Sequence, residues 1–220
     1  MNRHQMIEAN LRHVRERIAK AATEAGRDSN KILLIAVTKT FPISDVEILK
    51  TLGVGNFGEN RDGDAAPKAA AVAGTWHFQG QIQSNKLKSI CSWAHVIHSL
   101  DDVSHFRAIE KVATHPLEIF LQVNLDSTEH RGGASLENLY PLAEEIESNP
   151  IHKLAGLMAV APLGSNPEEA FSQLAAVQSS FLKRFPDARA LSAGMSGDFE
   201  IAIAHGATHL RIGSQILGSR

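Results

Sequence analysis

Cysteine is almost absent from this chain of 220 residues, in which Cys91 is the only one. A single cysteine excludes an intramolecular disulfide and a structural zinc site built on several cysteines. No segment reaches the roughly 18 consecutive apolar residues that a membrane helix requires. The chain opens with the polar, amphipathic segment MNRHQMIEANLRHVRERIAK, which has no apolar core of a secretory signal peptide. We therefore expect a cytoplasmic protein that has no metal ligands and does not enter a membrane.

An excess of charge of one sign is also lacking, because the formal net charge is -2 at pH 7. A balance of this kind does not favour a nucleic-acid surface or a surface for anionic membranes. Apolar residues make up 43% of the chain and charged residues 21%. These fractions are typical of a soluble globular protein.

Short apolar runs alternate with longer amphipathic segments along the chain, after an extra N-terminal helix. The predicted strands lie at residues 31–37, 55–58, 75–78, 94–97, 117–123, 154–158, 190–192 and 209–212. Helical patterns separate them, most clearly at 44–52, 137–148 and 168–185. Strands spaced in this way need crossover helices and a parallel sheet. The sequence therefore predicts a (β/α)8 TIM barrel, with a doubly wound open sheet as the alternative. We find no linker or low-complexity tract, and expect one domain over residues 1–220.

The segment from Gly53 to Gly58 matches the dinucleotide-binding pattern G-x-G-x-x-G, but its surroundings do not. The pattern requires a strand before the glycines and an acidic residue about 20 positions later. Here a helical pattern precedes them, and residues 65–100 contain no Asp or Glu. We interpret Gly53 as a helix end, and Gly55 and Gly58 as flanking a short buried strand.

Lys39 follows the first predicted strand by two residues, and the C-terminal ends of barrel strands are where barrel sites lie. Partial burial there would lower the pKa of the amine and let it form a Schiff base. The alternative is a surface lysine at the end of a strand.

Two loops near the end of the chain have the composition of phosphate sites. Ser192–Asp198 precedes a helical pattern, and Arg211–Gln215 follows the last predicted strand. Glycine and serine at such positions offer free backbone N–H groups and hydroxyls, and barrels often bind phosphate with the loops after strands 7 and 8. An amine facing a phosphate site suits an aldehyde-bearing phosphate, of which pyridoxal 5′-phosphate (PLP) is the commonest. Capped turns, or a site for another phosphate, are the alternatives.

Several ordered motifs carry a resemblance that covers nearly the whole chain. They are AVTKT (36–40), FGEN (57–60), WHFQG (76–80) with QSNK (83–86), GLM (156–158), GMSGD (194–198), and RIGS (211–214) with Gly218. With these motifs the chain strongly resembles the pyridoxal-phosphate homeostasis proteins, which are similar to the N-terminal barrel of bacterial alanine racemase.

The resemblance implies a role for each residue that would surround the cofactor. Lys39 would carry PLP covalently as a Schiff base, and Arg211 would face the pyridine nitrogen. At the phosphate, the contacts would come from Ser196 and from the backbone of Gly213 and Ser214. Asn60 and Met195 would contact the ring. His77 is a further candidate contact, with a core histidine as the equally good alternative. Relatives often show Lys-Ser-Gly after the fifth strand, where this chain has Arg131-Gly132-Gly133. Any role of that lysine is therefore not carried over to Arg131.

The same residues favour a binding protein over an enzyme. Arg211 cannot accept the proton of the pyridine nitrogen, so the ring would be a poor electron sink. Racemases of this kind take a second acid/base group, a tyrosine, from a further domain, whereas this chain ends at Arg220 and its only tyrosine is Tyr140, in a helical pattern. We expect a monomeric PLP carrier that has no catalytic residues and delivers PLP to PLP-dependent apo-enzymes. The alternative is a racemase or decarboxylase completed by oligomerisation.

Overall fold

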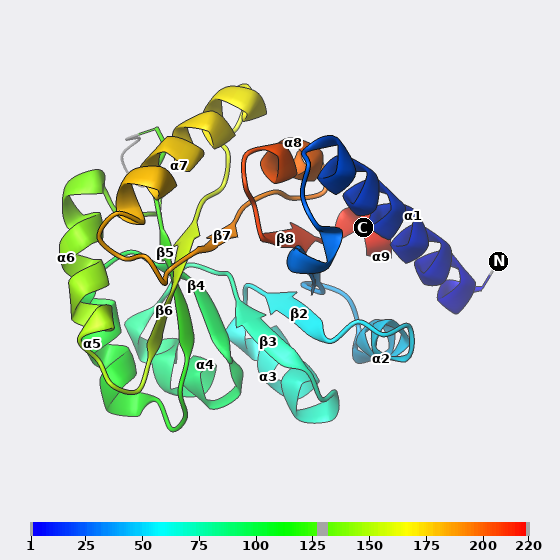
Figure 1. The fold of residues 1–220 in the computed structure, drawn as a ribbon. Helices are drawn as coiled ribbons and strands as arrows, with labels where there is room; N and C mark the ends of the chain where they lie inside the picture. The colour runs from blue at the N-terminus through cyan, green and yellow to red at the C-terminus, as the bar shows by residue number, and fades with distance from the viewer. Residues whose placement is uncertain (1, 127–131, 219–220) are drawn as a thin grey trace.

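The computed structural model describes residues 2–126 and 132–218, and within them the strands form a closed barrel in sequence order (Figure 1). All the strand pairs are parallel, and β1 pairs with both β2 and β8, which closes the sheet. The strands are Leu33–Val37 (β1), Asn56–Glu59 (β2), Thr75–Phe78 (β3), Val96–Leu100 (β4), Glu118–Gln122 (β5), Lys153–Met158 (β6), Ala190–Ser192 (β7) and His209–Ile212 (β8). The predicted barrel is confirmed, and the open-sheet alternative is wrong.

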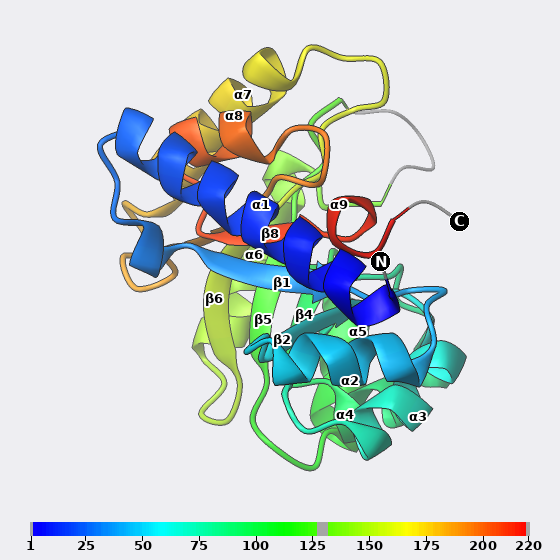
Figure 2. The same cartoon turned by 90° about the vertical axis from the view of Figure 1, so that its right-hand side faces the viewer.

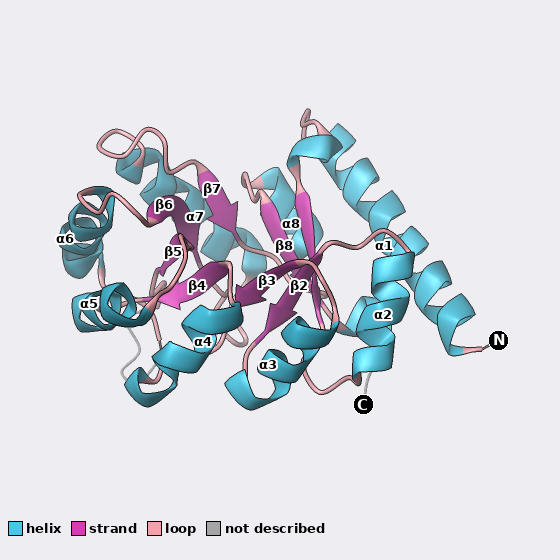
Figure 3. Cartoon of the chain, turned by 90° about the horizontal axis from the view of Figure 1, so that it is seen from below, coloured by secondary structure: helices cyan, strands magenta, loops and turns pink. Residues whose placement is uncertain are grey.

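Helices follow the strands and lie on the outside of the barrel (Figure 3). They are Arg3–Glu24 (α1), Ile43–Thr51 (α2), Asp62–Ala71 (α3), Leu87–Trp93 (α4), Val103–Val112 (α5), Leu136–Glu147 (α6), Pro167–Phe181 (α7), Phe199–Ala204 (α8) and Ser214–Leu217 (α9), with 3-10 turns at Ser29–Lys31 and Ser84–Lys86. The extra helix α1 packs against α2, α8 and α9 (Figure 2), and so joins the first and last βα units. No described helix is long and apolar enough to cross a membrane.

The strand predicted at residues 94–97 lies two to three residues further along, because β4 continues through His98 and Ser99. Both polar side chains are buried and have partners: His98 bonds to two other side chains, and the Ser99 hydroxyl donates to the carbonyl of Gly80. Buried polar groups with partners are tolerated within a strand, so their polarity does not end β4. The helix predicted to reach residue 185 ends at Phe181.

The interior of the barrel is more polar than the layer that surrounds it. Alternate residues of a barrel strand face inward. His77 on β3, His98 on β4 and Arg211 on β8 are buried at such positions. The Phe120 ring of β5 stacks on the His98 ring, with centroids 4.4 Å apart. A larger apolar cluster contains most of the other buried aliphatic and aromatic residues. These polar side chains therefore contact one another inside the barrel through hydrogen bonds that include Ser192.

Candidate functional site

Lys39 lies in a tight turn immediately after β1. The N–H of Phe41 donates to the carbonyl of Thr38 over 3.1 Å, which places Lys39 and Thr40 in the middle of the turn. The Lys39 side chain is exposed, and its amine has no hydrogen bond or ion pair with any described residue. Partial burial of Lys39 is therefore wrong, and the alternative of a surface lysine at the end of the strand is confirmed. The amine is open to a ligand that arrives from solvent.

The two predicted phosphate loops meet beside the end of β1. Ala36 of β1 is paired with Ile212 of β8, so Gly213 follows next to Val37. A Cβ on Gly213 would lie 3.1 Å from the Val37 carbonyl oxygen, which shows how closely the two strand ends approach. Gln215 joins the two loops through Ser196. Its backbone N–H donates to the Ser196 hydroxyl oxygen, and its side-chain amide donates to the Ser196 carbonyl. Ser196 and Ser214 therefore flank the strand end that precedes Lys39.

These loops present several backbone donors that the protein itself does not use. The N–H groups of Ser196, Gly197, Gly213 and Ser214 have no acceptor within the described part of the chain. Unpaired N–H groups that converge from two loops form a cradle for an anion. A phosphate is the anion that best matches several such donors together with the Ser196 hydroxyl. The donors present thus fit the phosphate of PLP.

Arg211 is fixed inside the barrel by a chain of hydrogen bonds. Its Nη1 donates to Ser192 Oγ over 2.7 Å, and its Nη2 donates to the Ala159 carbonyl over 3.0 Å. Ser192 Oγ lies 2.8 Å from His98 Nδ1, and His98 Nε2 lies 2.9 Å from His77 Nδ1. His77 Nε2 lies 3.0 Å from Asn56 Oδ1 at the far side. The chain thus crosses the barrel from β8 to β2.

The two histidines in this series of hydrogen bonds, His77 and His98, are uncharged at neutral pH. Burial lowers the pKa of His77 to about 3, with smaller contributions from His209 and His95. Burial is also the main cause that holds the pKa of His98 well below its ordinary value, followed by electrostatic interactions with His77 and Arg211. Desolvation lowers the pKa of Arg211 to about 10, so this side chain remains charged near pH 7. A fixed positive charge therefore stands beside neutral rings.

Because both rings are neutral, the hydrogen bonds in this series all point the same way, from Arg211 toward Asn56. Asn56 Oδ1 only accepts, so His77 carries its proton on Nε2 and accepts at Nδ1. His98 then donates from Nε2 and accepts the Ser192 hydroxyl proton at Nδ1. With both ring nitrogens engaged, His77 has none left for a cofactor, and its geometry is that of a core histidine.

The other predicted ring contacts lie at separate places on the rim. Asn60 is half-buried after β2 and lines a pocket of about 330 Å³ with Phe78 and Lys86. Met195 is 37% exposed at the tip of the loop after β7. Arg131 lies outside the described residues.

Sequence reasoning gave no individual role to two sets of residues that the structure brings to the site. Ser192 and His98 form part of the Arg211 chain, and Glu59 and Lys68 form a buried ion pair beside Thr38. The signal for Glu59 was its place next to Asn60 in the 57–60 motif. Nothing along the chain signals that Lys68 reaches it, because Lys68 lies on a helix with mostly small or exposed neighbours.

The family model described as "Alanine racemase, N-terminal domain" matches residues 5–220. Among curated relatives, the "Pyridoxal phosphate homeostasis protein" of Mycobacterium leprae is 38% identical over 232 residues, covering 94% of this chain and 90% of that protein. The protein of the same name from Escherichia coli K12 is 34% identical over 226 residues, covering 97% of each.

Solved structures show the same likeness. PipY of Synechococcus elongatus, solved with PLP bound, superposes with a TM-score of 0.80 at 29% identity, covering 91% of this chain and all of that one (100%). Alanine racemase from Corynebacterium glutamicum gives a TM-score of 0.72 at 11% identity. It covers 97% of this chain and 60% of the racemase, and shows a shared fold.

Proposed function

Since this chain belongs to the alanine racemase N-terminal domain family, and within it to the pyridoxal phosphate homeostasis proteins, we propose that it binds PLP and holds it covalently on Lys39. The amine nitrogen of Lys39 bonds to the aldehyde carbon, and one water leaves as the Schiff base forms. Bound PLP supplies the aldehyde that makes this link possible. Residues 1–220 serve as one cofactor-binding barrel domain.

The observation that carries this proposal is the convergence of three elements on one rim. The exposed amine of Lys39 follows β1, while the unpaired N–H groups of Ser196 and Gly213 follow β7 and β8. The phosphate would bind to these N–H groups and to the Ser196 hydroxyl, with the backbone of Ser214 alongside. Asn60 and Met195 would border the ring from the neighbouring loops. Each group needed to bind an aldehyde-bearing phosphate is thus present on one side of the barrel.

The role of the protein is to carry PLP, without efficient catalysis. Arg211 would face the pyridine nitrogen with a guanidinium that has no lone pair to offer. A carboxylate at that place would keep the nitrogen protonated, and Arg211 does the opposite. The chain has a single tyrosine, Tyr140 of α6, whose ring packs 5.9 Å from that of Phe181 in the outer layer. Tyr140 is therefore far from a role as the second acid/base group of a racemase.

Such a carrier would keep the free aldehyde concentration low in the cytoplasm and release PLP to apo-enzymes that require it. The exposure of Lys39 supports release, because the covalent link would form and break at a rim open to solvent. We propose a monomer as the working form, since Lys39, Ser196 and Gly213 all come from one chain.

The test compares the wild type with Lys39→Ala, using as the matched control Lys31→Ala, an exposed lysine in the 3-10 turn before β1. With added PLP, the wild type and the control should turn yellow and the Lys39 variant should not. The α-protons of D- and L-alanine, followed by NMR in heavy water, should exchange no faster than with free PLP. Exchange hundreds of times faster would identify an enzyme instead. A colourless wild type would leave a site for another phosphate.

A further inference from the structure

A buried ion pair lies directly behind the turn that carries Lys39. The Lys68 ammonium of α3 donates to Glu59 Oε1 over 2.7 Å and to the Thr38 carbonyl over 2.8 Å. Glu59 is fully buried at 0% exposure, and Lys68 is 5% exposed. The Thr38 hydroxyl donates to the same oxygen of Glu59 over 2.6 Å. The pair is therefore connected to the residue just before Lys39.

This pair is poorly suited to a purely stabilising role. Removing two charges from water costs as much as their attraction returns, and an apolar replacement of the same volume is often equally stable. Oε2 of Glu59 is buried and has no hydrogen-bond partner among the described atoms, which adds a further cost. The position of the pair therefore matters more than its contribution to stability.

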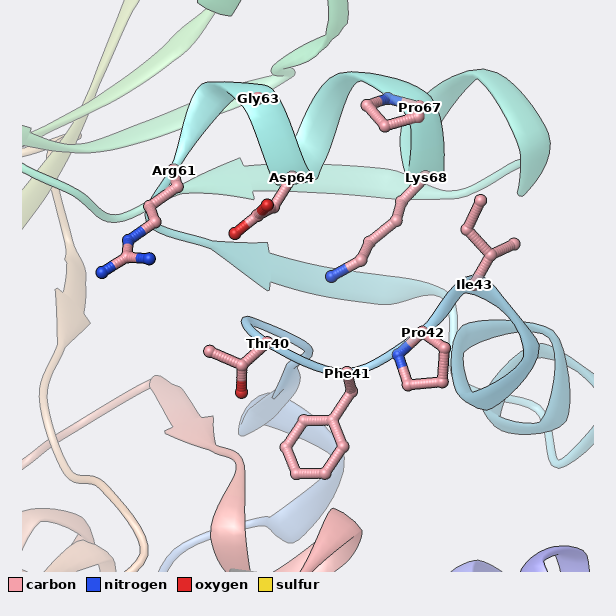
Figure 4. Close-up of a pocket in the computed structure, with 9 residues that line it drawn as sticks. All are labelled: Thr40, Phe41, Pro42, Ile43, Arg61, Gly63, Asp64, Pro67 and Lys68. Atoms are coloured by element: carbon pink, nitrogen blue, oxygen red, sulfur yellow. The ribbon is translucent and has the colours of Figure 1, made fainter. Parts of the chain in front are cut away.

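Every polar group of Thr38 has a partner, and the pair supplies the partners of its hydroxyl and its carbonyl. Its N–H donates to the Gly58 carbonyl over 2.9 Å, its hydroxyl is held by Glu59, and its carbonyl accepts from both Lys68 and Phe41. Figure 4 shows Lys68 extending from α3 toward the loop of Thr40 and Phe41, beside a pocket of about 450 Å³. Thr38 is therefore the fixed end of the turn.

The other end of the turn is strained. Thr40 has a φ of 69°, and it is the one residue other than glycine with a positive φ in the part of the chain that the structure describes. A turn with positive φ at its third residue favours glycine or asparagine there, and a β-branched residue is disfavoured. Such strain persists only where the surroundings impose the conformation. The bonds that hold Thr38 and close the turn on Phe41 stand directly before and after Thr40.

We propose that Glu59 and Lys68 are positioning residues that hold this strained turn and thereby direct the amine of Lys39 toward the aldehyde. The inference rests on the proposed function, because it concerns how Lys39 meets PLP. The loops of Ser196 and Gly213 fix the phosphate, and so the aldehyde carbon has one place on the rim. Without the pair, Thr40 relaxes to a negative φ, and Lys39 leaves the turn in another direction.

The test uses the double variant Glu59→Gln/Lys68→Met, which removes both charges and keeps the size of the side chains. We expect the Schiff base, trapped with borohydride and measured by intact mass, to form with an equilibrium constant about tenfold lower. Binding of pyridoxamine 5′-phosphate, which has the ring and phosphate but no aldehyde, should stay within about twofold of the wild type. The matched control is Glu118→Gln/Lys153→Met, an exposed pair at the opposite end of the barrel.

A rescue experiment tests whether strain at Thr40 explains the loss of Schiff base in the double variant. Glycine adopts a positive φ without cost, so adding Thr40→Gly to the double variant should restore most of the trapped Schiff base. Thr38→Val provides a second route, because it removes the hydroxyl bond and leaves the buried charges paired. It should lower the trapped fraction in the same direction even where the double variant fails to fold.

Three results decide the matter. Undiminished trapping in the double variant, or in Thr38→Val if the double variant does not fold, would overturn the positioning role. A parallel loss of pyridoxamine 5′-phosphate binding, with no rescue by Thr40→Gly, would mean that the pair only supports the fold. A wild type that neither binds PLP nor forms a trapped Schiff base would refute the proposed function itself. The wild-type measurement alone separates this outcome from the other two.

Discussion

Among the individual residues, Arg211 is the one whose surroundings the structure specifies most fully. Two of its nitrogens are engaged by Ser192 and by the Ala159 carbonyl, and neither partner carries a charge. Behind Ser192, the neutral rings of His98 and His77 continue the chain of hydrogen bonds to Asn56. A guanidinium fixed in this way keeps one orientation toward the rim. Its partners should therefore influence cofactor binding without touching the cofactor.

Replacing Ser192 with alanine tests this influence. Ser192→Ala removes an acceptor of Arg211 and the donor to His98, and leaves two buried polar groups short of a partner. The free energy of unfolding, measured with urea, should fall by about 1–3 kcal/mol, and PLP should bind more weakly. Ser92→Ala, which removes an exposed hydroxyl on α4, is the control and should change neither quantity. Equal behaviour of the two variants would mean that Ser192 does not hold Arg211.

The position of single residues could be predicted only in part. Lys39, Ser196 and Gly213 were expected together because the ends of parallel strands meet on one rim, and the structure places their loops side by side. The sequence left partial burial and exposure of Lys39 both open, since the choice depends on the turn through Thr40. The Arg211 chain was also beyond prediction, because it joins residues that are far apart in sequence and meet only across a closed barrel.

At the scale of elements, short apolar runs predicted the position of a strand well where polar residues lie on both sides of the run. The strands predicted at residues 75–78, 190–192 and 209–212 coincide with β3, β7 and β8. The fourth strand was placed too early, because His98 and Ser99 look like loop residues until their partners across the barrel are known. The pattern of hydrophobicity therefore gives the existence of an element more reliably than its ends.

The loop between β7 and α8 should be sensitive to one added methyl group. Gly194 has a φ of 89°, and a Cβ there would lie 2.8 Å from the Ala202 Cβ and 2.9 Å from the Phe199 Cα. Gly194→Ala should thus lower the free energy of unfolding by about 1–3 kcal/mol and weaken PLP binding, by displacing Ser196. Urea unfolding and fluorescence titration with PLP measure the two effects.

Gly63 of α3 is the matched control, because a Cβ there meets nothing within 4 Å. Gly63→Ala should raise the free energy of unfolding by about 0.5–1 kcal/mol, as expected for alanine in a helix. If Gly194→Ala were as stable as this control, the loop would tolerate the change and the geometry assigned to Ser196 would be incorrect.

At the scale of the whole molecule, the polar interior makes stability depend on pH. Burial lowers the pKa of His77 to about 3 and that of His209 to about 4, in each case from 6.5, and holds that of His98 well below 6.5. The unfolded chain therefore binds protons as the pH falls below 6.5, while the folded barrel does not. This contribution to stability is complete above 6.5 and is lost as the pH falls toward the folded values.

The expected loss is about 2 kcal/mol per buried histidine between about pH 7 and about pH 5. Urea unfolding at the two pH values measures it. His209→Asn should reduce the loss by about one histidine's share, whereas His4→Asn, on the exposed face of α1, should not. A loss unchanged in His209→Asn would show that this ring is not kept neutral by the fold.

Closure of the sheet is also a property of the whole molecule. Eight βα units predicted a parallel sheet, but whether it closes depends on the pairing of β1 with β8, whose residues lie at opposite ends of the chain. The sequence therefore left the open sheet as an alternative. The same closure brings the turn of Lys39 beside the loops of Ser196 and Gly213, so the proposed site exists only in the barrel.

The central claim is that PLP is bound to Lys39, and peptide mapping after reduction tests it most directly. The protein is saturated with PLP, reduced with borohydride and digested, and the masses of the peptides are measured by mass spectrometry. We predict one modified peptide, the one that contains Lys39, and none in Lys39→Ala. A modification on another lysine, such as Lys68 or Lys86, or no modification at all, would contradict the account.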